Sequence, residues 1–179
     1  KLALSQDGIY RLDRSFLESM GINVGAINPS GLGIFGNGGG MVPEDIDDSR
    51  VDDLQENAIR LVGMDDGSFD NGDYILFYGQ GPDRWELIDD RFEQVQNIYE
   101  DRTYYYLTTN RGTGKRVQER VSSSASATQS TSTFDDYAFV EDENENLLQS
   151  GREWFGDFFD AFTNSRDYSF SFPNRVSGE

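Results

Sequence analysis

The chain has 179 residues, and its 33 acidic and 15 basic side chains give a formal net charge of −18 at neutral pH. Such a surface repels the phosphates of nucleic acids and of anionic membranes, so neither is expected as a direct partner. The sequence contains no cysteine and no histidine. Disulfides, thiolate nucleophiles and histidine-based catalysis are therefore excluded within these residues, and we expect this chain by itself not to be an enzyme.

The first elements expected along the chain are two strands and one short helix. Residues 2–5 and 8–12 flank an Asp-Gly dipeptide, which predicts a β-hairpin. Asp13 suits the N-cap of a helix over residues 14–20, and Gly21 suits its C-terminal end. Because this helix has only about two turns, its apolar side must pack against another element.

Short strands separated by turns are expected over most of the remaining chain. The continuous apolar run at 74–78 predicts a central buried strand, and the alternation at 115–121 predicts an exposed antiparallel partner. The segment 122–133, rich in Ser, Thr and Ala, predicts a loop. The other strands are expected at 32–35, 56–62, 85–88, 103–109, 134–140 and 168–172.

These elements predict a mainly β fold, namely an antiparallel β-sandwich or barrel-like domain with one short N-terminal helix, with an α+β fold as the alternative. The 13 Phe, 9 Tyr and 2 Trp argue against disorder. We expect an N-terminal β-domain over residues 1–150, followed at 151–179 by a joint and the truncated start of a second β-module. No apolar run reaches the length of about 18 residues that a membrane-spanning helix needs, so direct membrane insertion is not expected.

A glycine-rich segment, GLGIFGNGGG at 31–40, contains the G-x-G-x-x-G spacing of dinucleotide-binding turns at Gly31, Gly33 and Gly36. That turn must lead into a helix whose N-terminus holds the pyrophosphate. Here three glycines and a proline follow, and they disfavour a helix by about 1 and 3 kcal/mol per residue, respectively. We therefore interpret the segment as a strand that enters a wide glycine turn at 36–40, and we predict no organic cofactor.

An acidic segment, DDGSFDNGD, supplies the candidate metal ligands. Calcium takes six to eight oxygen ligands from such loops, although the spacing here does not match an EF-hand. The alternative is a pair of Asx-type turns, at Asp66-Gly67 and Asn71-Gly72, that lead the chain into the apolar strand. Calcium is thus the one cofactor left open, with candidate ligands Asp65, Asp66, Asp70 and Asp73.

The aromatic cluster of Trp154, Phe155, Phe158, Phe159 and Phe162 has two interpretations. Packing in a core or between domains is favoured, because so much exposed aromatic surface promotes aggregation. A ligand-binding platform is the alternative. The acidic pairs at 47–48, 52–53 and 89–90 are interpreted as solvated loops rather than as glycosidase carboxylates.

Four stretches of the sequence, in this order, carry a resemblance that composition alone does not give: DGIYRLDRSFLESMGINVGAINPSGLGIFGNGGGMVPE, ENAIRLVGMDDGSFDNGDYILFYGQGPDRW, YYYLTT and SGREWFGDFF…YSFSFPN. Together they resemble the region N-terminal to the peptidase domain of gingipain-like cysteine peptidases. Within that family they are most similar to the sortase-like C-terminal signal peptidases of the Bacteroidetes type IX (Por) secretion system. The resemblance spans most of the chain, but it includes no catalytic motif.

The resemblance implies an exported parent protein, associated with the outer membrane or the cell surface, that processes secreted cargo with a Cys-His pair. Neither residue type occurs here, so no catalytic residue carries over, and we expect this chain to precede the catalytic domain. The implied role is a scaffold or docking domain, with its own downstream peptidase domain as partner and other secretion components as further ones. The alternative is a calcium-assisted β-module that binds carbohydrate or another surface ligand.

Overall fold

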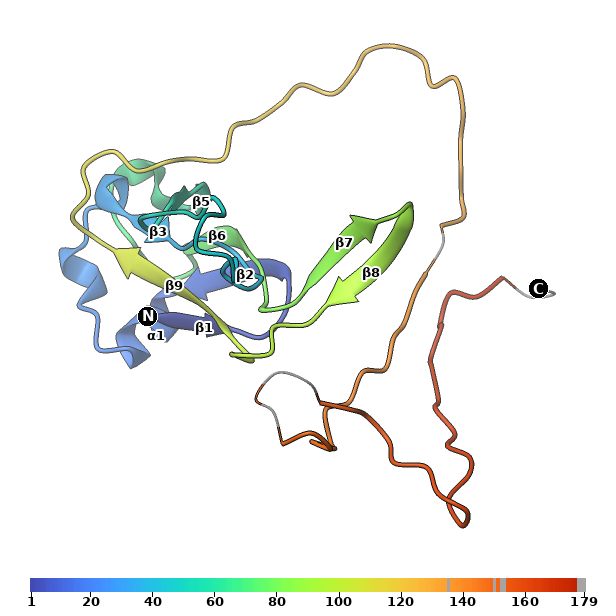
Figure 1. The fold of residues 1–179 in the computed structure, drawn as a ribbon. Helices are drawn as coiled ribbons and strands as arrows, with labels where there is room; N and C mark the ends of the chain where they lie inside the picture. Colours follow the sequence, from blue (N-terminus) through green and yellow to red (C-terminus); the bar gives the residue numbers. More distant parts are fainter. Residues whose placement is uncertain (135, 150, 152–153, 177–179) are drawn as a thin grey trace. The chain divides into compact units, whose positions relative to one another are not determined.

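The computed structural model describes residues 1–134, 136–149, 151 and 154–176. The chain divides into two units, Lys1–Val121 and Ser122–Glu179, which are described separately (Figure 1). This division falls at the start of the predicted loop at 122–133, whereas the predicted boundary followed residue 150. No helix in the described part of the chain is long and apolar enough to span a membrane.

The first unit is built from antiparallel strands in three sheets (Figure 1). The strands are β1 (Leu2–Leu4), β2 (Gly8–Asp13), β3 (Gly33–Phe35), β4 (Glu56–Asn57), β5 (Ile59–Val62), β6 (Tyr74–Gly79), β7 (Arg84–Ile88), β8 (Arg91–Val95) and β9 (Thr103–Thr108). The helices are α1 (Arg14–Ser19) and the short 3-10 helices η1 (Val24–Ala26), η2 (Pro29–Gly31) and η3 (Met64–Asp66). The sheet orders are β1-β9-β3-β4, β2-β6-β5 and β7-β8. The mainly β fold is confirmed.

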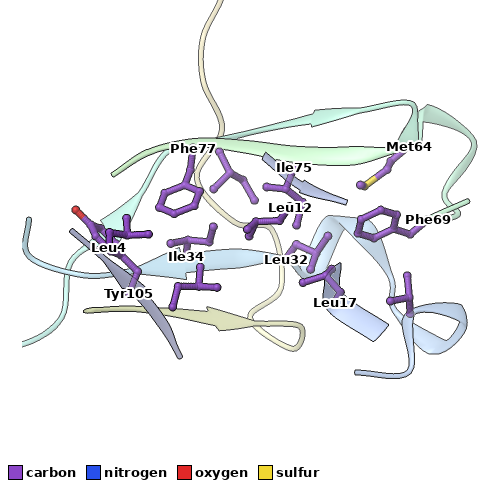
Figure 2. Close-up of a cluster of buried hydrophobic side chains, with 13 residues drawn as sticks. Leu4, Leu12, Leu17, Leu32, Ile34, Met64, Phe69, Ile75, Phe77 and Tyr105 are labelled. Atoms are coloured by element: carbon purple, nitrogen blue, oxygen red, sulfur yellow. The ribbon is translucent and has the colours of Figure 1, made fainter. Parts of the chain in front are cut away.

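The hydrophobic core lies between the four-stranded and the three-stranded sheet (Figure 2). The rings of Phe77 on β6 and Tyr105 on β9 meet edge to face with 5.5 Å between their centroids, so they join the two sheets directly. This arrangement is a sandwich, in which each sheet buries one face against the other. The other core residues from the strands are Leu2, Leu4, Leu12, Ile34, Ile59 and Ile75.

Helix α1 confirms its prediction closely. The carboxylate of Asp13 accepts a hydrogen bond from the backbone N–H of Phe16 at 3.0 Å. This bond, helped by a second one from the Ser15 hydroxyl, lowers the pKa of Asp13. Gly21 has a φ of +82°, as a glycine that ends a helix requires. Leu17 is fully buried and attaches this short helix to the core.

The predicted N-terminal hairpin is wrong, although both of its strands exist. β1 pairs with β9 in one sheet and β2 pairs with β6 in the other, so the chain crosses between sheets at residues 5–7. The carboxylate of Asp7 accepts a hydrogen bond from the backbone N–H of Gly81 at 2.7 Å. Asp7 therefore secures the crossing to a distant segment rather than closing a local turn.

Two further strand predictions need correction, while a third is confirmed. The single strand expected at 56–62 is interrupted at Ala58, and its halves β4 and β5 belong to different sheets. The segment 115–121 forms no antiparallel strand, only an isolated parallel bridge between Arg116 and Ile59. The segment 74–78 does form the central strand of its sheet, as β6.

The described residues of the second unit form no helix or strand, only one isolated bridge between Glu145 and Phe155. The loop predicted at 122–133 is confirmed. The strands predicted at 134–140 and 168–172 are wrong for the described residues, and residue 135 lies outside them. An alternating pattern forms a strand only where a neighbouring strand supplies hydrogen bonds, and none does so among the described residues of this unit.

Replacing Tyr105 with phenylalanine should destabilise the first unit by about 1–3 kcal/mol, because a backbone donor loses its acceptor. The Tyr105 hydroxyl accepts a hydrogen bond from the backbone N–H of Gln80 at 2.9 Å. Urea unfolding of both proteins at pH 7 measures the difference.

The same substitution should also change the pH dependence of stability. Burial raises the pKa of Tyr105 above its ordinary value of 10.0. A group whose pKa is raised on folding contributes its full stability below the unfolded pKa and loses it as pH rises towards the folded pKa. The stability gap between wild type and Tyr105→Phe should therefore narrow above about pH 10. A gap that stays constant or widens would contradict the burial of this hydroxyl.

Candidate functional site

The most exposed ordered element of the first unit is the hairpin β7-β8, which extends away from the two packed sheets (Figure 1). Asp89 and Asp90 link its strands, and both have positive φ, 49° and 63°, as a type I′ turn requires. The strand at 85–88 is confirmed as part of β7, but β8 was not predicted. Its local signal is weak, because RFEQV does not alternate strictly between polar and apolar residues and Asp-Asp is a weaker turn signal than Asp-Gly or Asn-Gly.

One face of this hairpin is largely apolar and open to solvent, and its one polar strand residue, Gln94, lies across from Trp85. Trp85 lies on this face, and Leu87 pairs across the strands with Phe92. The exposed fractions of these side chains are 39%, 62% and 74%, respectively. On the opposite face, Glu86 lies directly across from Glu93, a like-charge pair that destabilises an isolated hairpin. An exposed Trp-Leu-Phe face on a two-stranded arm is the kind of surface that binds another protein.

The glycine loop holds the base of the hairpin. The backbone N–H of Gly40 donates to the carbonyl of Pro82 at 2.7 Å, and Nε of Arg84 donates to the carbonyl of Gly39 at 2.7 Å. A Cβ atom on Gly39 would overlap the carbonyl oxygen of Gly81. Gly40 has a φ of +87°, and Gly38 one of +80°, which confirms that the turn at 36–40 includes left-handed residues.

The three glycines of the G-x-G-x-x-G spacing each allow a close approach within the sandwich. A Cβ on Gly31 would lie 2.8 Å from the Thr109 carbonyl oxygen, and one on Gly36 would press into the Tyr105 ring. A Cβ on Gly33 would lie 3.2 Å from the ring of Phe35. The strand before the loop is confirmed as β3, and the chain continues into the glycine turn instead of a helix. The spacing therefore serves packing.

The four candidate calcium ligands lie in and after η3, on the loop that leads into β6: Asp65, Asp66, Asp70 and Asp73. The Asp66 carboxylate accepts a hydrogen bond from the Ser68 N–H at 2.9 Å, and the Asp73 carboxylate accepts one from the Asp70 N–H at 2.6 Å. Within residues 1–134, 136–149, 151 and 154–176, no three acidic side chains gather closely enough to hold a metal. The Asp66 contact is that of the turn predicted at Asp66-Gly67, and Gly72 has a positive φ of 99°, while the calcium site stays a prediction.

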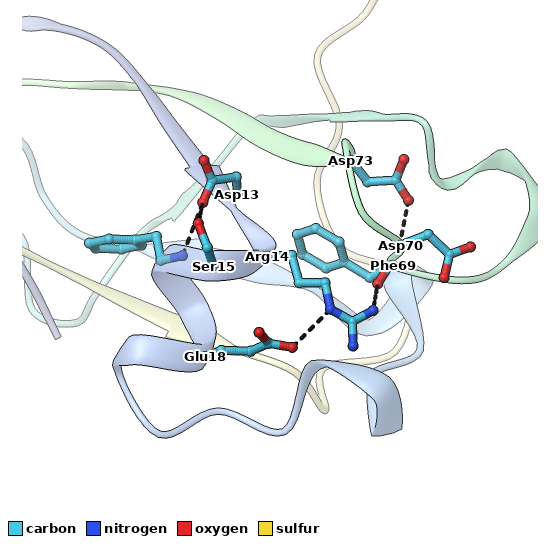
Figure 3. Close-up of polar contacts among 8 residues, drawn as sticks. Asp13, Arg14, Ser15, Glu18, Phe69, Asp70 and Asp73 are labelled. Atoms are coloured by element: carbon cyan, nitrogen blue, oxygen red, sulfur yellow. Dashed lines mark hydrogen bonds and ion pairs between the residues drawn. The ribbon is translucent and has the colours of Figure 1, made fainter.

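A guanidinium also reaches this acidic loop from the helix. Arg14 donates from Nη1 to the carbonyl of Phe69 at 3.0 Å and pairs through Nε with Glu18 at 2.8 Å (Figure 3). Phe69 is buried in the core, so this contact ties the loop to α1. The loop is thus attached to α1 by a hydrogen bond of the protein itself.

The aromatic cluster at 154–162 lies in the second unit. All five side chains are exposed, from 42% for Phe155 to 97% for Phe162. They form no core with the described residues of that unit, which corrects part of the packing interpretation. Both packing against another domain and the ligand platform stay predictions. Of the acidic pairs, Asp89 and Asp90 form the hairpin turn described above.

No family model matches the chain, and no curated protein matches it. Among solved structures, the chain is similar to PorU. The structure is that of dimeric latent PorU from Porphyromonas gingivalis, with 28% sequence identity and a TM-score of 0.49. The match covers 71% of this chain and 11% of the PorU chain, so the chain spans about a tenth of the length of PorU.

Proposed function

We propose that this chain is a non-catalytic N-terminal scaffold and docking domain of a type IX secretion sortase, a peptidase that processes secreted cargo at the cell surface. The observation that carries the proposal is the ordered resemblance of four sequence stretches to the region before the peptidase domain of gingipain-like enzymes. The first three stretches fall in the first unit, where they supply α1, the glycine loop and the central strands β6 and β9. The parent protein would be exported and associated with the outer membrane or cell surface.

The proposed role is structural because the chain offers no group for the chemistry of a cysteine peptidase. Such a peptidase needs a thiolate and a base, and the sequence has neither cysteine nor histidine. The purified chain should therefore not cleave peptides that contain a cargo cleavage site. Cleavage that persists after inhibition of contaminating proteases would contradict this part of the proposal.

The surface that we assign to docking is the apolar face of β7-β8. Leu87 lies directly across from Phe92, and Trp85 lies two residues before Leu87 on the same face. The glycine loop fixes the base of the hairpin through the bond from Arg84. Burial of such side chains in a partner is worth about 1.5–3 kcal/mol for each fully buried side chain. The expected partner is the peptidase domain that follows in the same parent protein, with other secretion components as further partners.

In the parent protein, the double substitution Leu87→Ser and Phe92→Ser should reduce cargo processing by about tenfold or more, because it removes the centre of the docking face. Both side chains are exposed, so the melting temperature of the isolated chain should change little. Release of the cargo's C-terminal signal in cells measures processing.

The matched control for this experiment is Ile9→Ser. Ile9 lies on β2, is 75% exposed and is outside the hairpin, so this variant should process cargo normally. Normal processing by the hairpin variant, or an equal loss in the Ile9 variant, would show that the arm does not dock.

A further inference from the structure

The outer face of the four-stranded sheet carries a shallow pocket of about 350 Å³. It is separate from the hairpin and from the acidic loop. Phe35 on β3 and Tyr106 on β9 are direct cross-strand neighbours and form its aromatic wall. Leu54 borders the wall and, like Tyr106, is more than two-fifths exposed. The lining residues are Phe35, Asp53, Leu54, Tyr106, Thr108 and Arg111.

The aromatic wall is held in place from two sides. The ring of Phe35 lies against Gly33, where a Cβ atom would lie only 3.2 Å from the ring. The Arg111 guanidinium lies over the same ring, 5.1 Å from its centroid. The backbone N–H of Arg111 also donates to the Gly31 carbonyl at 3.2 Å, so the base of this side chain is fixed.

The polar groups around the wall retain unused hydrogen-bonding capacity. One oxygen of the Asp53 carboxylate accepts from the Leu54 N–H at 2.7 Å, which leaves its second oxygen available. Among the described residues, the Arg111 guanidinium makes no hydrogen bond or ion pair, and neither do the hydroxyls of Tyr106 and Thr108. The pocket thus combines donors and acceptors around an apolar surface, which is the pattern of a small-molecule site.

The charge of the pocket favours a neutral ligand. Asp53 and Arg111 are the charged residues of its lining, and their charges cancel. A charged ligand of either sign would be attracted by one of these two groups and repelled by the other, and the net charge of −18 further disfavours an anion. A sugar ring presents an apolar C–H face to an aromatic side chain and hydroxyls that pair with both carboxylate and guanidinium. We propose that this pocket binds one ring of a neutral saccharide. The volume lies at the lower end of the range for small-molecule sites, about 300–1,000 Å³, as a single ring requires.

The whole chain should be titrated with glucose, galactose, mannose and N-acetylglucosamine while backbone amide shifts are followed by NMR. At least one of these sugars should shift the amides of Leu54, Tyr106 and Arg111 in a saturable way. Tyr106→Ala should weaken binding about tenfold, because it removes half of the wall. Asp53→Asn should weaken it less, because the amide oxygen can still accept from Leu54.

Tyr104→Ala is the matched control. Tyr104 lies on the same strand and the same outer face as Tyr106, but outside the pocket, with Lys1 over its ring at 3.5 Å. Sugar binding by this variant should equal that of the wild type. The proposal is overturned if none of the neutral sugars causes saturable amide shifts, or if glucuronate or a tetra-alanine peptide binds instead. It is also overturned if the Tyr104 variant loses as much sugar affinity as the Tyr106 variant. Because the proposed docking role uses another surface, either proposal can fail without the other.

Discussion

Replacing Phe77 with alanine should destabilise the first unit by about 3–5 kcal/mol, a large share of the total stability of a domain this size. Phe77 is 2% exposed and lies at the centre of β6, the middle strand of its sheet. Its ring contacts Tyr105 in the facing sheet and Tyr10 on the neighbouring strand, with centroid distances of 5.5 and 5.7 Å. Removing it leaves a cavity between the sheets that the remaining side chains cannot close.

Urea unfolding of wild type and variant, followed by circular dichroism, measures this loss. The matched control is Tyr78→Ala, one residue further along the same strand. Tyr78 is 55% exposed on the other face and makes one hydrogen bond, to Asp7 at 3.2 Å. Its removal should cost about 1 kcal/mol or less. Similar losses for the two variants would mean that β6 does not bury the face described above.

Replacing Gly39 with alanine should cost about 1–3 kcal/mol or more, because the new methyl group has no space. It would overlap the carbonyl oxygen of Gly81, which is backbone and cannot rotate away as a side chain can. Because Gly39 does not have a positive φ, the loss of stability would come from the lack of space for the methyl group and not from backbone strain. The loop would have to move away from the hairpin base, which weakens the bond from Arg84.

Unfolding experiments measure the stability loss, and hydrogen exchange of the amides in 84–95 measures the expected loosening of the arm. Gly25→Ala is the control, since its Cβ would meet only the Asn23 side chain at an ordinary 3.7 Å. It should change neither stability nor exchange appreciably. Faster exchange in both variants, or in neither, would contradict the supporting role of the glycine loop.

Several elements could be predicted because their signals are local. Asp13 and Gly21 mark the two ends of α1 through bonds and dihedral angles within a few residues. The runs that became β6 and β9 contain aromatic and β-branched residues, which favour strands wherever a partner is available. At Gly38 and Gly40 the dense glycine spacing correctly indicated left-handed backbone.

The candidate site was harder to predict because its parts come from distant segments. Trp85 was placed on a strand, but the apolar face that it shares with Leu87 and Phe92 depends on the unpredicted strand β8. The pocket on the outer face of the four-stranded sheet brings Asp53 close to Tyr106 and Arg111, and no sequence motif links these residues. The four aspartates of the acidic loop had a recognisable composition, but two of their carboxylates accept hydrogen bonds from nearby backbone N–H groups.

By itself, the sequence determined that this chain lacks the side chains of a cysteine peptidase and where most strands, the helix and the glycine turn lie. Only the tertiary structure decided which sheet each strand joins: β1 and β2 separate although a turn signal links them, and 56–62 divides between two sheets. The reason is physical. Strand and turn preferences act over a few residues, whereas strand pairing follows from how two sheets share one core. The glycines at 31–40 combine a local and a tertiary feature. The lack of a side chain can be seen in the sequence, but the atoms that leave no space for a Cβ lie on β9 and at the hairpin base.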